Sequence, residues 1–217
     1  MQTKPRNKIT ILIAEDHPVT IQGVCSIIER ASDMEIVGKA QDGAQIQPMI
    51  EKLRPDILLL DLIMPNLSPT ALEKWVCENY PETTTIVLTA HDRDAYLANM
   101  MDAGVSGYLD KKLRAGQLIA SIRRAARGEV LFDKEQIERA ARWHRQVREK
   151  WENLTKREQD VLMMLTEGAD NKTIAQSLKV TASTVEKHIT NLYKKLGVTS
   201  RTEAVAWWFE KGGDFHN

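Results

Sequence analysis

Three carboxylates stand directly after two apolar runs in the first half of the chain. Asp61 follows the four apolar residues 57–60, and Glu15 and Asp16 follow the largely apolar run 9–14. Carboxylates that gather at one place repel one another unless a cation joins them, and Mg²⁺ is a hard cation that takes oxygen ligands of this kind. An ionised carboxylate can also attack phosphorus and form an aspartyl-phosphate. These residues therefore favour phosphoryl transfer at a divalent metal ion.

Two further polar residues have a similar position relative to a strand-like run. Thr89 follows residues 85–88, and Lys111 comes shortly after the run 107–109. A hydroxyl and an ammonium group could hold the oxygens of a transferred phosphoryl group. Each residue taken alone has a simpler interpretation, as a solvated loop or cap residue. Five residues of these types at the ends of four strand-like runs argue against coincidence.

These side chains can meet only if the strands are parallel, because the carboxyl ends of parallel strands lie at one edge of a sheet. Strand and helix patterns alternate five times before residue 128. Such alternation predicts an α/β fold, a five-stranded parallel (βα)5 domain with helices on both faces. The strands are expected at 9–14, 34–40, 57–60, 85–88 and 107–109, and the helices at 19–30, 43–53, 69–79, 94–102 and 114–127.

The composition limits the possible partners and compartments. The 217 residues include 30 basic and 30 acidic side chains, so the net charge indicates no partner. Residues 150–201 are mildly basic, with 9 basic and 6 acidic side chains, which permits nucleic-acid binding. Two cysteines without a paired spacing favour a reducing compartment. The start lacks a signal-peptide core and no apolar run reaches the roughly 18 residues of a membrane span, so we expect a cytoplasmic protein without membrane attachment.

The second half of the chain has helical periodicity throughout. Residues 131–150 are dominated by Glu, Lys, Arg and Ala, which predicts a charged linker helix. Thr155, with Glu158 three residues later, forms a capping box that opens the next helix. A short helix, a turn and a longer polar helix then follow, an order typical of a helix-turn-helix. The four helices after the linker are expected at 155–165, from 170 or 171 to 178, at 184–196 and at 201–209.

Together these motifs resemble the two-component response regulators of the NarL/FixJ class, in which a receiver domain is joined to a LuxR-type helix-turn-helix. The receiver motifs stand here as EDHP at 15–18, DLIMP at 61–65, VLTAH at 87–91 and GYLDK at 107–111. The DNA-binding motifs stand as LTKRE at 154–158, NKTIA at 171–175, TVEKH at 184–188 and KLGV at 195–198. The resemblance implies a receiver domain at 1–128, a helical linker at 129–150 and an all-α four-helix DNA-binding domain at 151–217.

The resemblance also assigns roles to the residues at the strand ends. Asp61 would be the phosphoacceptor, and Lys111 would bind the phosphoryl group. The metal ion implied is Mg²⁺. Its ligands would be Glu15, Asp16, Asp61 and the backbone carbonyl of Met64, and the switch pair would be Thr89 and Tyr108.

In the DNA-binding half, the resemblance makes the helix at 184–196 the recognition helix, whose first residues lie at base edges in the major groove. Glu186 stands where related proteins usually carry Lys. It could form a capping box with Ser183, the interpretation we prefer, or accept a hydrogen bond from a cytosine amino group. Residues expected at base edges are Ser183, Glu186, Lys187 and Thr190, and those expected at phosphates are Lys172, Lys194, Lys195 and Arg201.

The function implied is that of a transcription factor, not an enzyme. A sensor histidine kinase would phosphorylate Asp61 and so favour a homodimer on promoter DNA, with RNA polymerase as a further partner. A phosphatase similar to the haloacid dehalogenases is one alternative, but it needs a second Asp where Ile63 stands. A phosphorylation-independent regulator with a vestigial receiver is another, and the complete set of acidic, hydroxyl and lysine residues argues against it.

Overall fold

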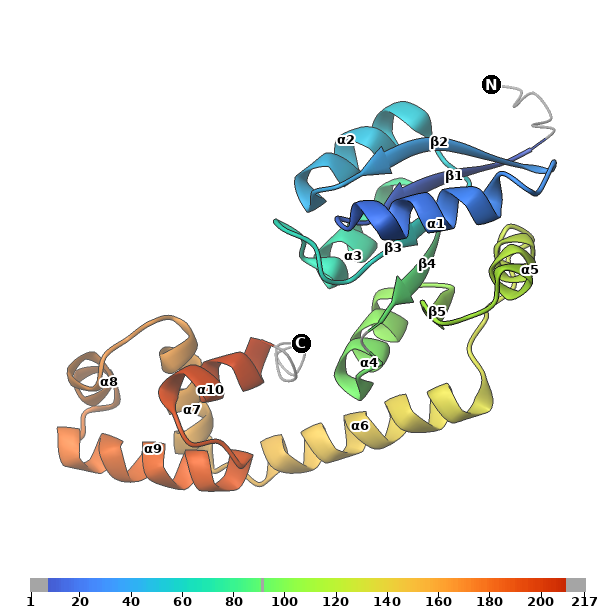
Figure 1. The fold of residues 1–217 in the computed structure, drawn as a ribbon. Helices are drawn as coiled ribbons and strands as arrows, with labels where there is room; N and C mark the ends of the chain where they lie inside the picture. The colour runs from blue at the N-terminus through green and yellow to red at the C-terminus, as the bar shows by residue number, and fades with distance from the viewer. Residues whose placement is uncertain (1–7, 91, 210–217) are drawn as a thin grey trace. The chain divides into compact units, whose positions relative to one another are not determined.

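The structure is a computed structural model that describes residues 8–90 and 92–209 (Figure 1). The chain divides between Ala140 and Ala141 into two compact units. His91, which belongs to one of the receiver motifs, lies outside the described residues. Among the residues described, no helix has both the length and the apolar character needed to cross a bilayer.

The first unit contains the predicted five-stranded sheet, in which all neighbouring strands are parallel and the order is β2-β1-β3-β4-β5. β1 and β4 flank the central strand β3, in which all four residues are buried. The strands are β1 (Ile9–Ala14), β2 (Met34–Ala40), β3 (Ile57–Leu60), β4 (Thr84–Thr89) and β5 (Gly107–Asp110).

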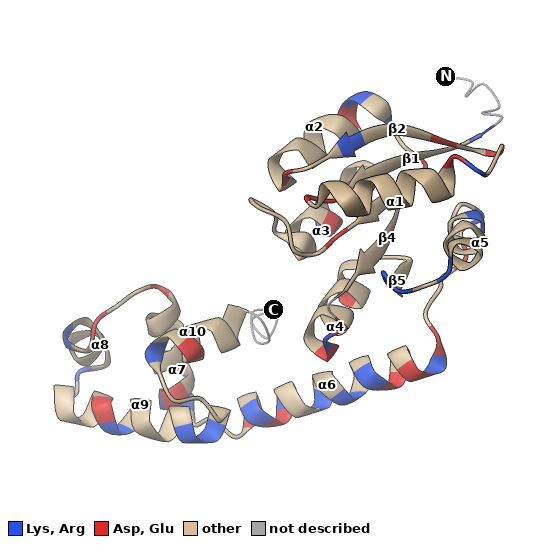
Figure 2. Cartoon of the chain, viewed as in Figure 1, with Lys and Arg blue, Asp and Glu red and all other residues tan. Residues whose placement is uncertain are grey.

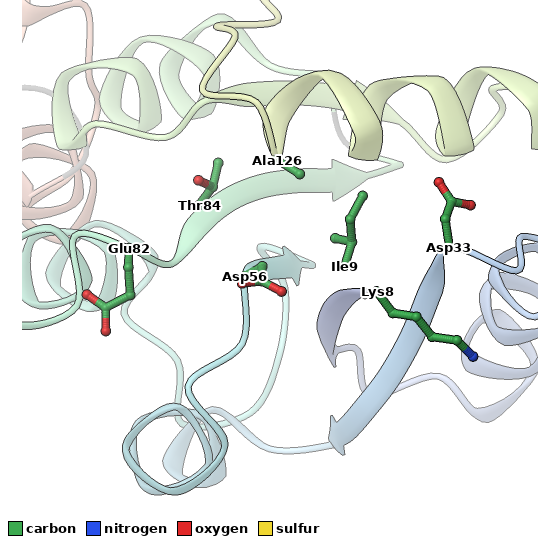
Figure 3. Close-up of a pocket in the computed structure, with 7 residues that line it drawn as sticks. All are labelled: Lys8, Ile9, Asp33, Asp56, Glu82, Thr84 and Ala126. Carbon is green, nitrogen blue, oxygen red and sulfur yellow. The ribbon is translucent and has the colours of Figure 1, made fainter. Parts of the chain in front are cut away.

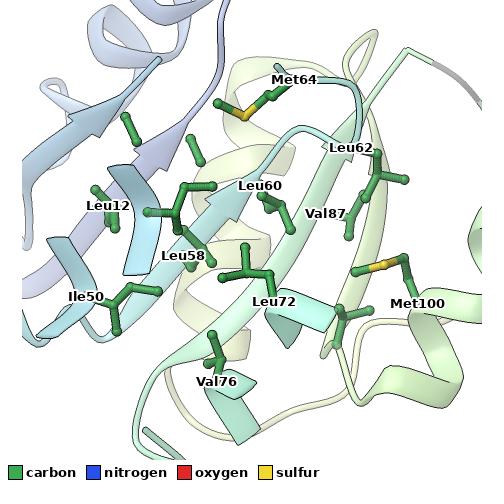
Figure 4. Close-up of a cluster of buried hydrophobic side chains, with 14 of the residues drawn as sticks. Leu12, Ile50, Leu58, Leu60, Leu62, Met64, Leu72, Val76, Val87 and Met100 are labelled. Atoms are coloured by element: carbon green, nitrogen blue, oxygen red, sulfur yellow. The ribbon is translucent and has the colours of Figure 1, made fainter. Parts of the chain in front are cut away.

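Helices cover both faces of this sheet, as the alternating pattern predicts. Leu58 and Leu60 point into the core beneath α2, α3 and α4 (Figure 4), whereas Ile57 and Leu59 point into the core beneath α1 and α5. This two-sided burial explains why β3 is apolar without alternation. The helices are α1 (Pro18–Ile28), α2 (Gly43–Leu53), α3 (Pro69–Asn79), α4 (Asp94–Ala103) and α5 (Ala115–Ala125).

The linker helix, α6 (Lys134–Glu152), begins later and ends later than the linker expected at 129–150. Residues 129–133 are not helical, and the last of them, Asp133, accepts a hydrogen bond from the backbone N–H of Gln136. The boundary between the two units falls inside this continuous helix. Its first part therefore belongs to the sheet unit and the rest to the second unit.

The second unit packs four further helices around one apolar core. Thr155 and Glu158 form the predicted capping box at the start of α7, and Asp170 caps α8. Trp207 and Trp208 are buried in this core, whereas Phe209 is exposed. The helices are α7 (Lys156–Thr166), α8 (Asn171–Leu178), α9 (Ala182–Leu196) and α10 (Arg201–Trp207).

The start of α9 corrects one prediction. The helix begins at Ala182 instead of residue 184, because Thr181 is its cap and its hydroxyl accepts a hydrogen bond from the N–H of Thr184. Ser183 therefore lies inside the first turn. The expected capping box between Ser183 and Glu186 does not form, since a cap residue must stand outside the helix.

Candidate functional site

The carboxylates predicted to meet do so at the carboxyl edge of the sheet. Oxygens of Glu15, Asp16 and Asp61 lie within 4.8 Å of one another and of a ring nitrogen of His17. The sheet brings them together, because the N–H of Asp61 donates to the carbonyl of Ala14 at 2.9 Å and so fixes the end of β3 beside the end of β1. Glu15 and Asp61 are 4% and 5% exposed, which makes their mutual repulsion costly.

Lys111 extends from the end of β5 into this acidic cluster. Its ammonium nitrogen lies 2.6 Å from Oε2 of Glu15 and 2.9 Å from Oδ2 of Asp61. Partial burial works against the charged ammonium, but the hydrogen bonds to Glu15 and Asp61 outweigh it, so the pKa of Lys111 is raised. Lys111 is therefore protonated at neutral pH and neutralises part of the negative charge.

The other oxygen of Asp61 has no such partner. Oδ1 is buried and makes no hydrogen bond within the described part of the chain. A buried carboxylate oxygen without a donor is costly, and a cation or a phosphoryl group with its counter-ions would remove that cost. The carboxylate oxygens gathered here are hard ligands that suit a divalent cation such as Mg²⁺. The cluster therefore fits a metal ion and presents one carboxylate oxygen for reaction.

The two residues expected to form the switch pair lie in β4, which is next to β3, and in β5, which is next to β4. Thr89 ends β4 and is 1% exposed, and Tyr108 in β5 is 3% exposed. The N–H of Lys111 donates to the carbonyl of Thr89 at 2.9 Å, which ties the lysine to the end of β4. Burial, together with the negative charge of Asp92, raises the pKa of Tyr108, so its hydroxyl stays protonated.

Met64 lies in the loop after β3, and the start of α2 holds this loop in place. Asn66 has φ +55°, a left-handed conformation that Asn tolerates better than most residues. Its Nδ2 donates to Oδ2 of Asp42 at 2.8 Å, and the N–H of Gly43 donates to the carbonyl of Pro65 at 2.8 Å. These contacts fix the loop on both sides of Pro65. The role of the Met64 carbonyl as a metal ligand stays a prediction.

His17 also belongs to the cluster, although its side chain is mostly exposed. Its Nδ1 lies 2.7 Å from Oδ1 of Asp16 and 3.2 Å from Oε1 of Glu15. His17 also stands directly before Pro18, the first residue of α1. Its contacts are with the acidic residues at the edge of the cluster, which fits a role in holding them.

A pocket of about 330 Å³ lies at the opposite, amino edge of the sheet (Figure 3). Its acidic residues are already engaged by the protein. Asp33 forms an ion pair with Arg123 at 2.8 Å, and Oδ2 of Asp56 accepts from the N–H of Thr10 at 2.7 Å. The chemically competent group is therefore at the carboxyl edge, not in this pocket.

In the second unit, the residues expected at base edges lie on the exposed side of α9. Ser183, Glu186, Lys187 and Thr190 are all exposed. The hydroxyl of Thr190 donates to the backbone carbonyl of Glu186 at 2.9 Å. The last turn of α9 contains the basic residues Lys194 and Lys195, and Figure 2 marks basic residues in blue at this end of the helix.

The residues expected at phosphates differ in their surroundings. Lys172 and Lys194 are exposed on the surface of the unit. Lys195 instead pairs with the buried carboxylate of Glu158 at 2.7 Å, and Arg201 donates to the backbone carbonyl of Ala169. Lys172 and Lys194 are thus the phosphate candidates whose side chains make no hydrogen bond or ion pair within the described residues.

Several residues that support the site gave no local signal in the sequence. The contact between Asp42 and Asn66 joins residues 24 positions apart, and Arg139 reaches Asp92 and Asp94 across 47 and 45 positions. A spacing rule for helices or strands detects neither. Only the fold brings these residues together.

The arrangement defines a class of protein, a receiver domain with a cluster of carboxylates at its sheet edge joined to a helix-turn-helix unit. Residues 11–123 match the response regulator receiver domain family, and residues 152–208 match the bacterial regulatory proteins of the luxR family. The chain belongs to the NarL/FixJ class of DNA-binding two-component response regulators.

Curated relatives agree with this assignment, and solved structures share the fold. The chain is 30% identical over 224 residues to the transcriptional regulatory protein DegU of Brevibacillus brevis, which covers 95% of both chains. It is 30% identical to the response regulator protein VraR of Staphylococcus aureus, over 93% of this chain and 97% of that protein. RcsB of Salmonella typhimurium has a similar fold, with a TM-score of 0.64 at 22% identity over 93% of this chain and 100% of that structure. The receiver domain of NarL from Mycobacterium tuberculosis covers 57% of this chain and 100% of that structure, with a TM-score of 0.55 at 26% identity.

Proposed function

We propose that Asp61 accepts a phosphoryl group from a sensor histidine kinase and that this modification controls assembly of the protein on promoter DNA. The observation that carries the proposal is the buried Oδ1 of Asp61, which has no hydrogen-bond partner in the described residues. The same carboxylate is paired with Lys111 through its other oxygen. One oxygen is thus held while the other is available to a phosphorus atom.

In the proposed transfer, an oxygen of Asp61 attacks the phosphorus of a phosphohistidine. The new O–P bond forms as the N–P bond breaks, and the imidazole leaves with the electron pair of that bond. Lys111 would hold an oxygen of the transferred group by its positive charge, and Thr89 would donate its hydroxyl to another. A bound Mg²⁺ would neutralise charge on the phosphoryl oxygens, held by Glu15, Asp16, Asp61 and the Met64 carbonyl.

The modification would act on the second unit through a shift between two states of the receiver. A phosphoryl group that attracts Thr89 and Lys111 favours the state in which the ends of β4 and β5 are drawn towards Asp61. We expect that state to form a homodimer, which brings two recognition helices to promoter DNA and from there affects RNA polymerase. One solved relative is an RcsB–DNA complex, and another contains two RcsB dimers bound to DNA. The protein would act in the cytoplasm as a regulator and not as an enzyme.

Size-exclusion chromatography with light scattering tests the proposal. The wild-type protein, Asp61→Asn and Asp110→Asn would be compared with and without Mg²⁺ and a small-molecule phosphodonor. Asp110 is an exposed carboxylate at the end of β5 and serves as the matched control. The proposal requires a donor-dependent dimer and an added phosphoryl mass in wild type and Asp110→Asn, but not in Asp61→Asn. A donor response that survives in Asp61→Asn would refute it.

A further inference from the structure

The chain segment that leads into α6 packs back onto the sheet unit. The N–H of Leu131 donates to the carbonyl of Ser106 at 2.7 Å, just before β5 begins. A Cβ on Gly107 would lie 3.1 Å from the Leu131 side chain, so the two segments are in close contact. Phe132 packs against the core on the α2–α4 face of the sheet. The start of α6 is therefore attached to β5, the strand that carries Tyr108.

Gln136 extends this attachment to Tyr108 itself. Its Oε1 accepts from the N–H of Asp133 at 3.1 Å, and its Nε2 donates to the carbonyl of Tyr108 at 2.8 Å. One amide group thus closes the cap of α6 and holds the backbone of the switch residue. A movement of Tyr108 would disturb the first turn of α6.

Arg139, one turn further along α6, binds the segment between β4 and α4. Its Nη1 and Nη2 donate to the two carboxylate oxygens of Asp92 at 2.9 and 2.8 Å, and its Nε donates to Oδ1 of Asp94 at 2.8 Å. This fork geometry is the strong form of an arginine–carboxylate interaction. The Arg139 side chain is 18% exposed, whereas Asp92 and Asp94 are 50% and 42% exposed, so water still reaches the acidic side of this group.

Tyr108 lies next to this arginine cluster. Asp92 and Arg139 are close enough for their charges to act on its hydroxyl in opposite directions, and the backbone of Arg93 contacts that hydroxyl. Thr89, the other switch residue, precedes Asp92 by three residues along the chain. Tyr108 is thus close in space to Asp92 and Arg139, and Thr89 is connected to Asp92 along the backbone.

We infer that Asp92, Asp94 and Arg139 form a latch that holds α6 against the receiver and opens when Asp61 is phosphorylated. The latch is closed in the state in which Lys111 pairs with Asp61 and Glu15. A phosphoryl group on Asp61 would draw Thr89 towards it, and this displaces Asp92 and Asp94 from the fork of Arg139. The inference deepens the proposed function and depends on it.

Linkage fixes the direction of the coupling. If phosphorylation lowers the equilibrium constant for closing the latch by a given factor, then opening the latch must raise the equilibrium constant for phosphorylation by the same factor. α6 continues without interruption from the sheet unit into the second unit. A change at Tyr108 that disturbs the first turn of α6 would therefore affect a helix that both units share. The latch therefore acts against activation in the unmodified protein.

Hydrogen exchange of the backbone amides of residues 134–140, measured on the full-length protein, tests the latch. The substitution Arg139→Gln removes the charge and the fork, and Arg142→Gln is the matched control, because Arg142 is exposed on the same helix. Without phosphodonor, we expect about tenfold faster exchange of this segment in Arg139→Gln and no change in Arg142→Gln. In wild type, phosphodonor and Mg²⁺ should produce the same acceleration.

Intact mass, recorded on the same samples, separates the two proposals. If wild type gains a phosphoryl group and exchange in this segment stays unchanged, the latch is refuted while the proposed phosphorylation stands. If wild type gains no phosphoryl group, both proposals fail. Arg139→Gln should also reach a higher phosphorylated fraction than wild type at limiting donor, and an equal or lower fraction would contradict the latch.

Discussion

The ammonium nitrogen of Lys195, near the end of α9, lies 2.7 Å from Oε2 of Glu158, in the first turn of α7. The same Oε2 accepts from the N–H of Thr155 at 2.7 Å, and Glu158 is 3% exposed. Burial alone would raise the pKa of Glu158, but the hydrogen bonds from Lys195 and Thr155 lower it overall. This contact joins the capping box of α7 to α9, the helix expected to enter the major groove.

We therefore predict that Lys195 positions α9 and does not serve mainly as a phosphate contact. The substitution Lys195→Met would leave a buried carboxylate with one donor fewer and should lower the free energy of unfolding by roughly 1–3 kcal/mol. Its salt slope for DNA binding should stay near that of wild type. Lys194→Met is the control, because Lys194 is exposed, and it should reduce the salt slope by about 1 with little loss of stability. A reduced salt slope in Lys195→Met together with a loss of stability in Lys194→Met would contradict the prediction.

The lowered pKa of Glu158 predicts a pH dependence of stability. A carboxyl group with a depressed folded-state pKa contributes stability above its unfolded value of 4.5, and that contribution is lost as the pH falls through the lower folded value. Below about pH 4.5, the melting temperature of wild type should therefore fall more steeply with decreasing pH than that of Lys195→Met. If the melting temperatures of the two proteins fell equally steeply in this acid range, Lys195 would not lower the pKa of Glu158.

Glu186 is predicted to contribute to base preference. Thr181 caps α9, so Glu186 is not used in a capping box, and its carboxylate has no hydrogen-bond or ion-pair partner in the described chain. A carboxylate on a recognition helix can accept a hydrogen bond from a cytosine amino group. Selection from random DNA should give a cytosine preference in wild type that Glu186→Gln weakens by about 1–3 kcal/mol at that base pair. Identical selected sequences for both proteins would exclude this role.

Lys187 gives a second test on the same helix, and a comparison of the selected site with random DNA separates its two possible roles. If Lys187 reads a base, Lys187→Ala should weaken binding to the selected site by roughly 1–3 kcal/mol and leave random DNA nearly unaffected. Titrations of both DNAs with wild type and variant measure this difference. Equal losses on the two DNAs would identify Lys187 as a phosphate contact.

The sequence predicts the sheet and the cluster at its edge because both depend on local patterns. A buried parallel strand must be apolar throughout, and Asp61 directly after such a run must lie at the carboxyl edge. The latch is not predictable in this way, because Arg139 meets Asp92 only after β4, α4 and α6 have packed. The cap of α9 was misassigned for a different reason. Hydroxyl residues stand at both 181 and 183, and sequence alone does not decide which of them caps the helix.

Glu73 is a further residue that the sequence does not distinguish from a surface acid. It lies on α3 but is 2% exposed, and its Oε2 makes no hydrogen bond in the described residues. Burial raises the pKa of Glu73, and its contacts with Thr85 and Cys77 only partly oppose this effect. A raised folded-state pKa contributes stability that is present below the unfolded value of 4.5 and is lost as the pH rises through the folded value.

We therefore predict that Glu73→Gln stabilises the receiver domain at pH 8, by roughly 1 kcal/mol, since a neutral amide avoids the cost of a buried charge. Melting curves from pH 4 to pH 8 should show the advantage of the variant growing as the pH rises. Glu78→Gln, an exposed acid on the same helix, is the control and should change little. A constant difference across the pH range would show that Glu73 does not titrate above its ordinary range.

Gly43 is predicted to set the position of the loop that carries Met64. A Cβ at residue 43 would lie 2.7 Å from the backbone oxygen of Asn66 and 2.7 Å from the N and Cα atoms of Leu67, so Gly43→Ala must displace the loop backbone. We expect a loss of about 1–3 kcal/mol in stability and weaker Mg²⁺ binding in calorimetric titration, because the displaced loop includes the proposed carbonyl ligand. Gly116→Ala in α5 is the matched control, since a Cβ there meets no atom within 4 Å and alanine favours a helix. Unchanged Mg²⁺ affinity in a folded but destabilised Gly43→Ala protein would show that this loop does not supply a metal ligand.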